Sequence, residues 1–574
     1  MSHLQRFLYF PHLFDKREKA VLFILCIVAV VSGGAFLTRV YRRVTVEAPA
    51  VGGIYREGLL REPRAINPLY ADANDTDRDI ARLVFAGLFR YDGSGAIQPD
   101  LAEGFTLNAE KTLYTVTLKD NLRWHDGQIL DADDILFTIH AIQNPLYKSP
   151  LKANWSGVDA AKRDARTIDL TLKTPYAPFI ENLTVGILPE HLWAQIPPDQ
   201  ALLHEFNLKP VGTGPFMYQS VSQEKSGRIL SLTLEPSPRY HLQGPFIKSF
   251  SFVFFPTDAD RIAAWRRGVI DGFGPVGPDE RENASAHTAF MTARMPRIFG
   301  IFFNPEKSAP LKELAVRRAI RLAIDTRALT QSSNDTIVPA PSFIPSLQTG
   351  GAASPDKEAS DPEMAREILT DALWTDDDGD GIRDKILKRR EKPTPLSLTL
   401  TTSETPLLTA VAEQIRAALA PLGIAVTVRT LPYSELETTI IRPRDYEMLL
   451  FGQVYGYEPD PFAFWHSSQA KDPGLNITRY SDKETDALLE KGRKIGDAAE
   501  RRDTFDKINT RLEKDAPAVM LFTQNFTYAL PADLRGVNIS YVALPADRFN
   551  AANQWYFKSK RVFPSRSAAP APTN

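Results

Sequence analysis

Residues 122–137, LRWHDGQILDADDILF, carry the most informative local pattern in this chain of 574 residues. A strand-like run at 114–118 precedes the stretch, and His125, Asp126 and Gly127 are typical of a turn. A helix is expected to begin among the aspartates that follow, because acidic side chains in a first turn suit the helix dipole. These aspartates are Asp131, Asp133 and Asp134, and Ile135, Ile139 and Ile142 make the apolar face of the helix. The stretch therefore predicts a strand, a turn and a helix in that order.

The segments on either side of this stretch alternate between strand and helix patterns. Before it, residues 52–61 have a strand pattern and residues 77–89 have helical spacing. After it, Asp361 can cap a helix. A strand, a helix that ends at Gly423 and a second strand then follow within 396–428, which is a βαβ unit expected to be parallel and right-handed. We therefore expect an α/β protein.

Residues 20–37, AVLFILCIVAVVSGGAFL, form an uncharged apolar run that is long enough to cross a bilayer. At 1.5 Å per residue they extend over roughly 27 Å, close to the hydrocarbon thickness of a membrane. Basic residues flank both ends, which suits lipid headgroups but does not decide the orientation. A cleaved signal peptide is the alternative, although residues 33–35, GGA, make a poor cleavage site. We favour an uncleaved transmembrane anchor at 20–38, preceded by a short cytoplasmic tail at 1–19.

Cys26, within the apolar run, is the only cysteine in the sequence. The rest of the chain can therefore form neither disulfides nor thiolate metal sites, and it has no cysteine nucleophile. A cysteine-free domain suits an oxidising compartment, which favours translocation across the membrane. The formal net charge of -2 gives no basic footprint for nucleic acid. We expect an extracytoplasmic domain on a single-pass inner-membrane anchor, with no nucleic acid partner.

Several blocks, taken in order, make the chain resemble a known family. Residues 122–137 resemble the Trp-His-Asp-Gly turn and Asp-Asp helix start of the family 5 extracellular solute-binding proteins, the peptide and oligopeptide receptors of ABC importers. Six other blocks resemble that family, and the resemblance covers residues 52–545. They are REPRAINPLYADAND (61–75), VFAGLFRYD (84–92), PDLAEGF (99–105), VGTGPFMY (211–218), FFNPEKSAPLKELAVRRAIRLAIDTRAL (302–329) and RYSDKETDALLEKG (479–492).

The resemblance implies an α/β fold of the periplasmic-binding-protein type, type II or cluster C, plus one N-terminal transmembrane helix. Two lobes, the first of them noncontiguous, would be joined by paired crossing strands near 299–304 and 520–526, and would close over a ligand. The expected divisions are a tether at 39–51, lobe I at 52–298 with a subdomain at about 79–210, lobe II at 299–522, a return to lobe I at 523–563 and a disordered tail at 564–574.

Residues 449–468, LLFGQVYGYEPDPFAFWHSS, resemble the ligand-binding loop of the family. In its amine-anchoring receptors this loop has a Trp and, three residues later, an Asp that pairs with the peptide's ammonium group. Val454 and Tyr457 occupy those two places here, so the usual anchor is absent. Glu458 or Asp460 could replace it, and the loop tyrosines either contact a ligand or pack in the core. The candidate ligand-binding residues, including two on the opposite lip of the cleft, are Glu62, Arg64, Tyr455, Tyr457, Glu458 and Asp460.

Residues 376–384, DDDGDGIRD, reproduce most of an EF-hand-like calcium loop. Alternate acids would supply carboxylates, and Gly381 suits the tight turn. The twelfth position is Leu387 rather than a bidentate Glu, which lowers the expected affinity. A solvated Asp/Gly turn is the alternative to a structural calcium site, and no cofactor is required for binding. The candidate metal ligands are Asp376, Asp378, Asp380, Ile382 and Asp384.

The motifs of common enzyme classes are missing from the sequence. It has no HExxH zinc pair, no GxGxxG loop, no Walker A lysine loop and no nucleophile with a base and an orienting residue. We therefore expect a binding protein rather than an enzyme. The resemblance implies a monomeric receptor that captures di- or oligopeptides and delivers them to ABC permease subunits. The alternative is a membrane-tethered sensor or scaffold with the same fold and a non-peptide ligand.

Overall fold

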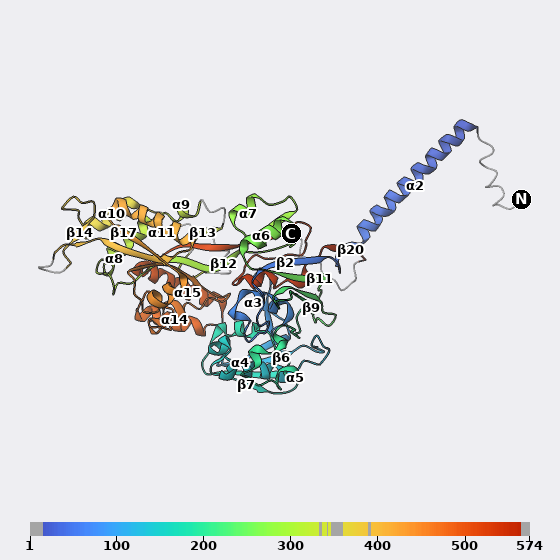
Figure 1. Cartoon of the computed structure of the whole chain (residues 1–574), viewed down its shortest axis with the longest axis horizontal. Helices are drawn as coiled ribbons and strands as arrows, with labels where there is room; N and C mark the ends of the chain where they lie inside the picture. Colours follow the sequence, from blue (N-terminus) through green and yellow to red (C-terminus); the bar gives the residue numbers. More distant parts are fainter. Residues whose placement is uncertain (1–14, 332–335, 341, 346–359, 388–391, 564–574) are drawn as a thin grey trace.

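The computed structural model of the chain shows an elongated body from which one helix projects (Figure 1). This helix, α2 (Lys16–Val44), leaves the body beside β20 (Lys558–Val562). The predicted disordered tail at 564–574 and most of the predicted cytoplasmic tail lie outside the described residues. The structure describes residues 15–331, 336–340, 342–345, 360–387 and 392–563.

The stretch at 122–137 folds as predicted. β6 (Leu113–Leu118) precedes the turn, and α4 (Ala132–Gln143) begins after Asp131, whose carboxylate accepts a backbone N–H of the first helical turn at 2.9 Å. The carboxylate of Asp134 accepts the backbone N–H of Asp131 at 3.1 Å in return, which completes a capping box. The aspartates of this motif therefore set the start of the helix.

His125 holds the turn in place between two backbone groups. Its Nδ1 accepts the N–H of Gly212 at 3.2 Å, so the ring proton is on Nε2, which donates to the carbonyl of Gly214 at 3.0 Å. Burial lowers the pKa of His125 to about 4, which keeps the ring neutral at pH 7. His125 is therefore a structural residue of the turn.

We call the part of the body formed by residues 46–295 and 526–563 lobe I, and the part formed by residues 298–522 lobe II. Lobe I contains two main sheets and the small pair β3 (Phe89–Tyr91) and β4 (Ile97–Pro99). One sheet has the strand order β2 (Ile54–Leu60), β11 (Ser249–Phe255), β10 (Ile229–Pro236) and β9 (Phe216–Gln223), with only β2 and β11 parallel. The other is antiparallel, in the order β5 (Ala102–Leu107), β6, β8 (Thr167–Leu172) and β7 (Val158–Lys162).

The helix predicted at 77–89 is shorter in the structure. α3 (Asp75–Val84) ends before Gly87, and β3 begins at the position where the helix was expected to end. A side chain at Gly87 would lie 2.7 Å from the backbone of Thr184, so only glycine fits there. Glycine is a poor helix former. The helix therefore ends before Gly87, although the apolar spacing continues beyond it.

The described sheet of lobe II includes the predicted βαβ unit. β16 (Ser397–Ser403) and β17 (Ala425–Leu431) are parallel and are joined by α11 (Pro406–Leu419). The helix predicted after Asp361 is α10 (Pro362–Asp371), and the Asp361 carboxylate accepts the backbone N–H of Met364 at 2.9 Å. Both predictions are confirmed. The strand order is β13 (Ile337–Pro339), β19 (Ala518–Pro531), β12 (Thr288–Phe303), β18 (Met448–Val454), β16 (Ser397–Ser403) and β17 (Ala425–Leu431).

Two long strands of this sheet run from one lobe into the other. β12 has 16 residues and β19 has 14, and they pair antiparallel. The pairing extends from Thr288 opposite Pro531 to Phe302 opposite Ala518. The crossings expected from the resemblance overlap with these two strands. The chain thus enters lobe II and returns from it along one two-stranded ribbon.

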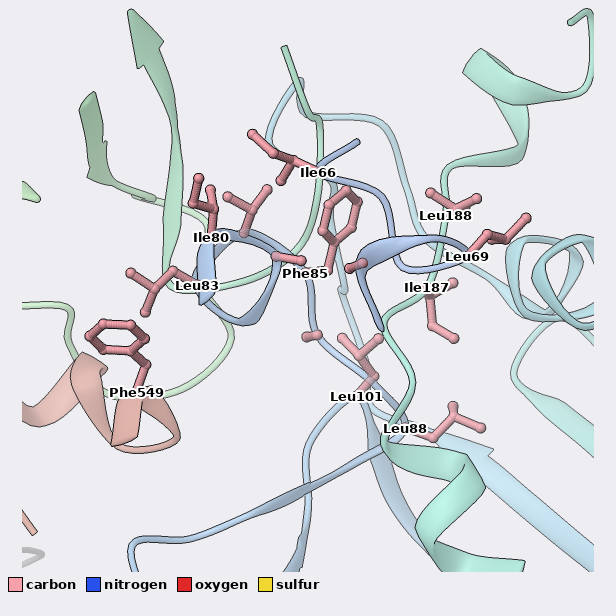
Figure 2. Packing of buried hydrophobic residues seen from close by; sticks show 14 of the residues in the cluster. Ile66, Leu69, Ile80, Leu83, Phe85, Leu88, Leu101, Ile187, Leu188 and Phe549 are labelled. Atoms are coloured by element: carbon pink, nitrogen blue, oxygen red, sulfur yellow. The ribbon is translucent and has the colours of Figure 1, made fainter. Parts of the chain in front are cut away.

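The main core of lobe I joins the early and the late parts of the chain. Its buried residues come from Tyr55 to Met295 and from Phe526 to Trp555. Figure 2 shows Phe549, at the end of η12 (Pro545–Phe549), next to Leu83 of α3. The return segment therefore completes a core that the first strands begin.

The predicted tether at 39–51 has regular structure instead. α2 continues through the first part of it, because no proline or glycine interrupts the end of the helix. β1 (Val46–Ala50) then pairs antiparallel with β20. The guanidinium group of Arg561 donates to the carbonyl of Arg42, in the last turn of α2, at 2.7 Å. The helix is therefore attached directly to the end of lobe I.

The other described helices lie on the sheets or between them. The helices are α5 (Glu190–Trp193), α6 (Asp258–Arg266), α7 (Pro278–Glu282), α8 (Leu314–Ala323), α9 (Thr326–Gln331), α12 (Tyr433–Glu435), α13 (Phe462–Trp465), α14 (Lys483–Lys494) and α15 (Ala498–Asp515), and a short pair is formed by β14 (Asp384–Lys385) and β15 (Thr394–Pro395).

Candidate functional site

A cavity of about 390 Å³ lies where lobe I meets the loop that follows β18. Ligand sites commonly have volumes of roughly 300–1,000 Å³, so this cavity is at the small end of the range. Its walls come from α3, β3, η5 (Ala177–Thr184) and η12 of lobe I and from the β18 loop of lobe II. Among its lining residues are Arg82, Tyr91, Glu181, Tyr455, Tyr457 and Asp547.

The β18 loop inserts Tyr457 into lobe I. The ring of Tyr457 stacks on that of Tyr91, with centroids 3.7 Å apart and an interplanar angle of 19°. The ring of Tyr541 lies 5.3 Å away, and the amide group of Asn550 donates to the Tyr457 hydroxyl at 3.4 Å. Tyr457 is only 4% exposed. In this arrangement it lines the cavity and is also the main ring contact between the β18 loop and lobe I.

Tyr455 lines the cavity but uses its hydroxyl group within lobe II. The hydroxyl donates to the carbonyl of Phe343 at 3.0 Å and accepts the indole N–H of Trp465 at 3.1 Å. Burial raises the pKa of Tyr455 above its ordinary value. The Tyr455 hydroxyl is therefore already paired inside the core of lobe II.

The two loop carboxylates expected to replace the missing anchor are paired with arginines of lobe II. Arg493 of α14 donates to Asp460 from Nη2 at 2.6 Å and from Nε at 2.9 Å. The hydroxyl of Tyr176 also donates to Asp460, at 3.3 Å. Arg501 of α15 forms an ion pair with Glu458. Neither carboxylate residue is among those that line the cavity, and both hold the loop against the two helices.

Glu62 and Arg64, expected on the opposite lip of the cleft, lie just after β2. The Glu62 carboxylate accepts the backbone N–H of Ile229 at 2.7 Å. The backbone N–H of Arg64 donates to Asp77 at 2.8 Å. Both residues are exposed, and neither lines the cavity. A role for them in ligand binding stays a prediction.

Glu181 lies at the junction of the two lobes. Its Oε1 accepts the hydroxyl of Tyr91 at 2.8 Å and the backbone N–H of Glu458 at 2.6 Å. Burial first, and then the charges of Glu458 and Asp460, raise the pKa of Glu181 to about 7. The cavity wall therefore contains a carboxyl group that titrates near neutral pH and accepts hydrogen bonds from both lobes.

The return segment supplies the partner of a cavity arginine. Asp547 of η12 pairs with Arg82 of α3 at 3.0 Å, and both line the cavity. The next residue, Arg548, is fully buried and pairs with Glu57 of β2 at 2.9 Å and with Asp79 of α3 at 2.5 Å. Burial raises the pKa of Asp79 to about 6 although Arg548 lies beside it. These pairs connect η12 of the return segment to β2 and α3.

The acidic loop at 376–384 lies at the far end of lobe II, beside β14 (Figure 1). Three of its predicted ligands are exposed and offer carboxylate oxygens within 4.8 Å of one another. Asp384 is not in this group, and its backbone pairs with that of Thr375. The backbone N–H of Ile382 donates to a carboxylate of the loop at 2.7 Å. The gathered residues are Asp376, Asp378 and Asp380.

Sequence reasoning does not identify Glu181, Arg82 or Asp547 as site residues. Glu181 is the one acid in the apolar stretch that forms η5, and this isolation is the signal that could have revealed it. Asp547 and Arg82 are 465 residues apart in the chain, so no local pattern connects them.

Two lobes joined by a strand ribbon, with a cavity between them, are the fold of a solute-binding protein. The family described as bacterial extracellular solute-binding proteins, family 5 Middle, matches residues 96–474. The chain belongs to this family, and it is a non-enzymatic solute-binding receptor of an ABC importer. The predictions of this fold and of a binding protein rather than an enzyme are thereby confirmed.

Its relatives bind different solutes. The oligopeptide-binding protein AppA of Bacillus subtilis is 25% identical over 560 residues, which are 95% of this chain and 100% of AppA. The nickel-binding periplasmic protein of Escherichia coli is 28% identical over 463 residues, 76% of this chain and 82% of the relative. The structure of B. subtilis AppA in complex with a nonapeptide has a TM-score of 0.66 at 25% identity and covers 89% of this chain and 99% of AppA. The family therefore determines the class of receptor and not its ligand.

Proposed function

We propose that this protein captures short peptides in the cavity between its lobes and delivers them to the permease subunits of an ABC importer. The observation that carries the proposal is the position of the cavity, whose walls come from both lobes. A ligand bound there contacts both lobes and stabilises their contact, which is how a two-lobe receptor presents a closed form. AppA of B. subtilis, a relative over nearly the whole chain, binds a nonapeptide.

The size and the lining of the cavity favour a short peptide. A volume of about 390 Å³ is small for a ligand site. Peptide receptors obtain affinity from main-chain hydrogen bonds and therefore need few dedicated side chains. Histidine and cysteine are the side chains that bind nickel and similar metals best. The described residues of the cavity walls include neither of them.

Native mass spectrometry tests this proposal. The full-length protein would be purified gently in detergent from its own host, and the bound compounds would be released by denaturation and identified. We expect a mixture of short peptides. A single non-peptide compound would contradict peptide capture, and empty protein that peptide pools do not stabilise would favour a sensor or scaffold.

A matched pair of glycine variants provides the control. Gly456 lines the cavity, and a side chain there would lie 3.0 Å from the carboxylate of Glu181. Gly104 has no neighbour within 4 Å of an added side chain and lies outside the cavity. We expect Gly456→Leu to lose the co-purified peptides and Gly104→Leu to keep them.

We also propose that α2 remains in the mature protein and anchors it in the inner membrane, with the body outside the cytoplasm. α2 has 29 residues and is long and apolar enough to cross a membrane, although a signal sequence passes the same test. Its last turn is attached to lobe I by Arg561. Intact mass measurement of the protein in membrane fractions tests this proposal. Retention of residues 1–44 is expected, whereas a shorter mass in the soluble fraction would contradict it.

A further inference from the structure

Glu181 differs from the other carboxylates in the cavity walls. The walls contain four carboxylate residues, and three of them are paired with a basic side chain. In the described part of the chain, Glu181 has no such partner. The three pairs are Asp72 with Arg78 at 3.2 Å, Asp100 with His241 at 2.7 Å and Asp547 with Arg82 at 3.0 Å.

The hydrogen bonds of Glu181 leave one of its oxygens open. Both described bonds, from the Tyr91 hydroxyl and the Glu458 backbone, go to Oε1. Gly456 lies next to Oε2, since a side chain on it would come within 3.0 Å of that oxygen. Because Gly456 has no side chain, there is room beside Oε2 in the cavity that both residues line.

The charges around Glu181 do not balance. Glu458 is paired with Arg501 and Asp460 with Arg493, so the two guanidinium groups are already matched. An ionised Glu181 adds a third negative charge, and among the described residues no basic side chain forms an ion pair with it. A partly buried charge is costly unless a cation pairs with it, and the raised pKa of Glu181 expresses this cost.

We propose that Oε2 of Glu181 binds the positively charged group of the ligand, namely the N-terminal ammonium group of a short peptide. This inference rests on the proposed function, because it assigns the anchoring group in the same cavity. It also gives different roles to the nearby acids. Glu458 and Asp460 hold the β18 loop to lobe II, whereas Glu181 contacts the ligand from lobe I.

The proposal links ligand binding to the contact between the lobes. Oε1 of Glu181 accepts the backbone N–H of Glu458, which belongs to lobe II. An ammonium group at Oε2 favours the ionised carboxylate, and the ionised form is the better acceptor for that N–H. The ligand therefore strengthens a hydrogen bond between the lobes.

Peptides that differ only at the amino group test the inference. Two pools of tripeptides would be made from Ala, Val, Leu and Ser, one with free and one with acetylated N-termini, so that the ammonium group is the only cation. Affinities would be measured by calorimetry with the full-length protein in detergent, as wild type, Glu181→Gln and Glu235→Gln. Glu235 is a matched control, because it accepts a bond from Gln219 and does not line the cavity.

We expect acetylation to weaken binding to the wild type roughly tenfold to a hundredfold, as for the loss of a charge-assisted hydrogen bond. Glu181→Gln should bind the free pool more weakly than the wild type by the same factor, and its affinities for the two pools should be equal. Glu235→Gln should behave like the wild type. At pH 6 the wild type should release a proton on binding the free pool, and Glu181→Gln should not. Gln keeps the acceptor for Tyr91 and Glu458, and a thermal midpoint checks that the variant is folded.

Other outcomes would overturn the inference in distinguishable ways. If Glu181→Gln still separates the two pools by the wild-type factor, another group binds the ammonium. If the wild type binds both pools equally, peptide capture stands but no ammonium site exists. If the wild type binds neither pool, the proposed function fails and this inference fails with it.

Discussion

The rings of Tyr91 and Tyr457 stack across the junction of the two lobes, with their centroids 3.7 Å apart. Tyr91 belongs to β3 of lobe I, and Tyr457 comes from the loop that β18 of lobe II supports. The hydroxyl of the same Tyr91 donates to Glu181, which also accepts the backbone N–H of Glu458. The ring stack and the carboxylate therefore form one continuous contact beside the cavity.

Replacing Tyr457 with Ala should separate the lobes. The variant loses a buried ring and a stacked pair worth about 0.5–1.5 kcal/mol beyond its buried area. We expect a larger radius of gyration in small-angle scattering without ligand, and peptide affinity at least about tenfold weaker. Tyr433→Ala is the control, because Tyr433 is 59% exposed and stacks on Phe451 within lobe II. Unchanged scattering for Tyr457→Ala would show that the stack does not hold the lobes together.

Glu181 should make the unliganded protein less stable as the pH rises from about 4.5 to about 7. Its folded-state pKa of about 7 lies above the ordinary value of 4.5, so the folded state binds more protons than the unfolded state within this window. Stability is thus fully present below pH 4.5 and is lost as the pH rises. The groups that act on it are the hydroxyls of Tyr91, Tyr176 and Tyr541 and the carboxylates of Glu458 and Asp460, which are themselves paired with Arg501 and Arg493.

We expect Glu181→Gln to be more stable than the unliganded wild type at pH 8, by up to about 3 kcal/mol, and to differ little from it at pH 4.5. Scanning calorimetry at the two pH values measures this difference. A difference in thermal midpoint that does not depend on pH would mean that Glu181 is not the titrating group.

Arg548→Met should strongly destabilise lobe I. The substitution leaves the buried carboxylates of Glu57 and Asp79 without a cation, and removing one partner from such a cluster typically costs about 3–5 kcal/mol. Urea unfolding followed by tryptophan fluorescence measures the loss. Arg163→Met is the control, because Arg163 is exposed and its pair with Asp169 should contribute less than about 1 kcal/mol. Equal effects of the two substitutions would contradict a special role for the buried cluster.

The acidic loop at 376–384 should bind calcium weakly, with a dissociation constant of roughly 10⁻⁴–10⁻³ M, because its twelfth position lacks a glutamate. Terbium should show luminescence sensitised by Trp374, which lies two residues before the loop. Asp380→Asn should reduce this signal, whereas Asp377→Asn should not, since Asp377 is outside the group of three carboxylates. Chelators should not change peptide affinity. No signal above background would favour a solvated turn.

The elements that sequence reasoning predicts correctly depend on neighbours in the chain. Asp131 and Asp361 cap helices through backbone groups two or three residues away. The βαβ unit around α11 depends on a repeating apolar pattern and on Gly423, which has the positive φ that such a helix end requires. The family resemblance supplies the arrangement of the lobes, which no local pattern contains.

The parts that sequence reasoning misses depend on distant partners. Glu458 and Asp460 look like free acids in the sequence, but Arg501 and Arg493 follow them by 43 and 33 residues and pair with them in the fold. Glu181 is an isolated acid in an apolar stretch, but only the fold shows that it lies in a cavity wall and has no ion-pair partner among the described residues. Loop acids can thus be identified from sequence, but whether their charge is available to a ligand cannot.

The crossing ribbon of β12 and β19 also determines the order in which the lobes can fold. During synthesis every strand of lobe II except part of β19 leaves the ribosome before residue 520. Arg548 follows its partner Glu57 by 491 residues, and Trp555 enters the same core as Tyr55. Most strands of lobe I are made first. Its core nevertheless becomes complete only after that of lobe II, because it needs residues up to Trp555. A chain that stops shortly after β19 would have lobe II intact and lobe I with uncompensated acids in an open core.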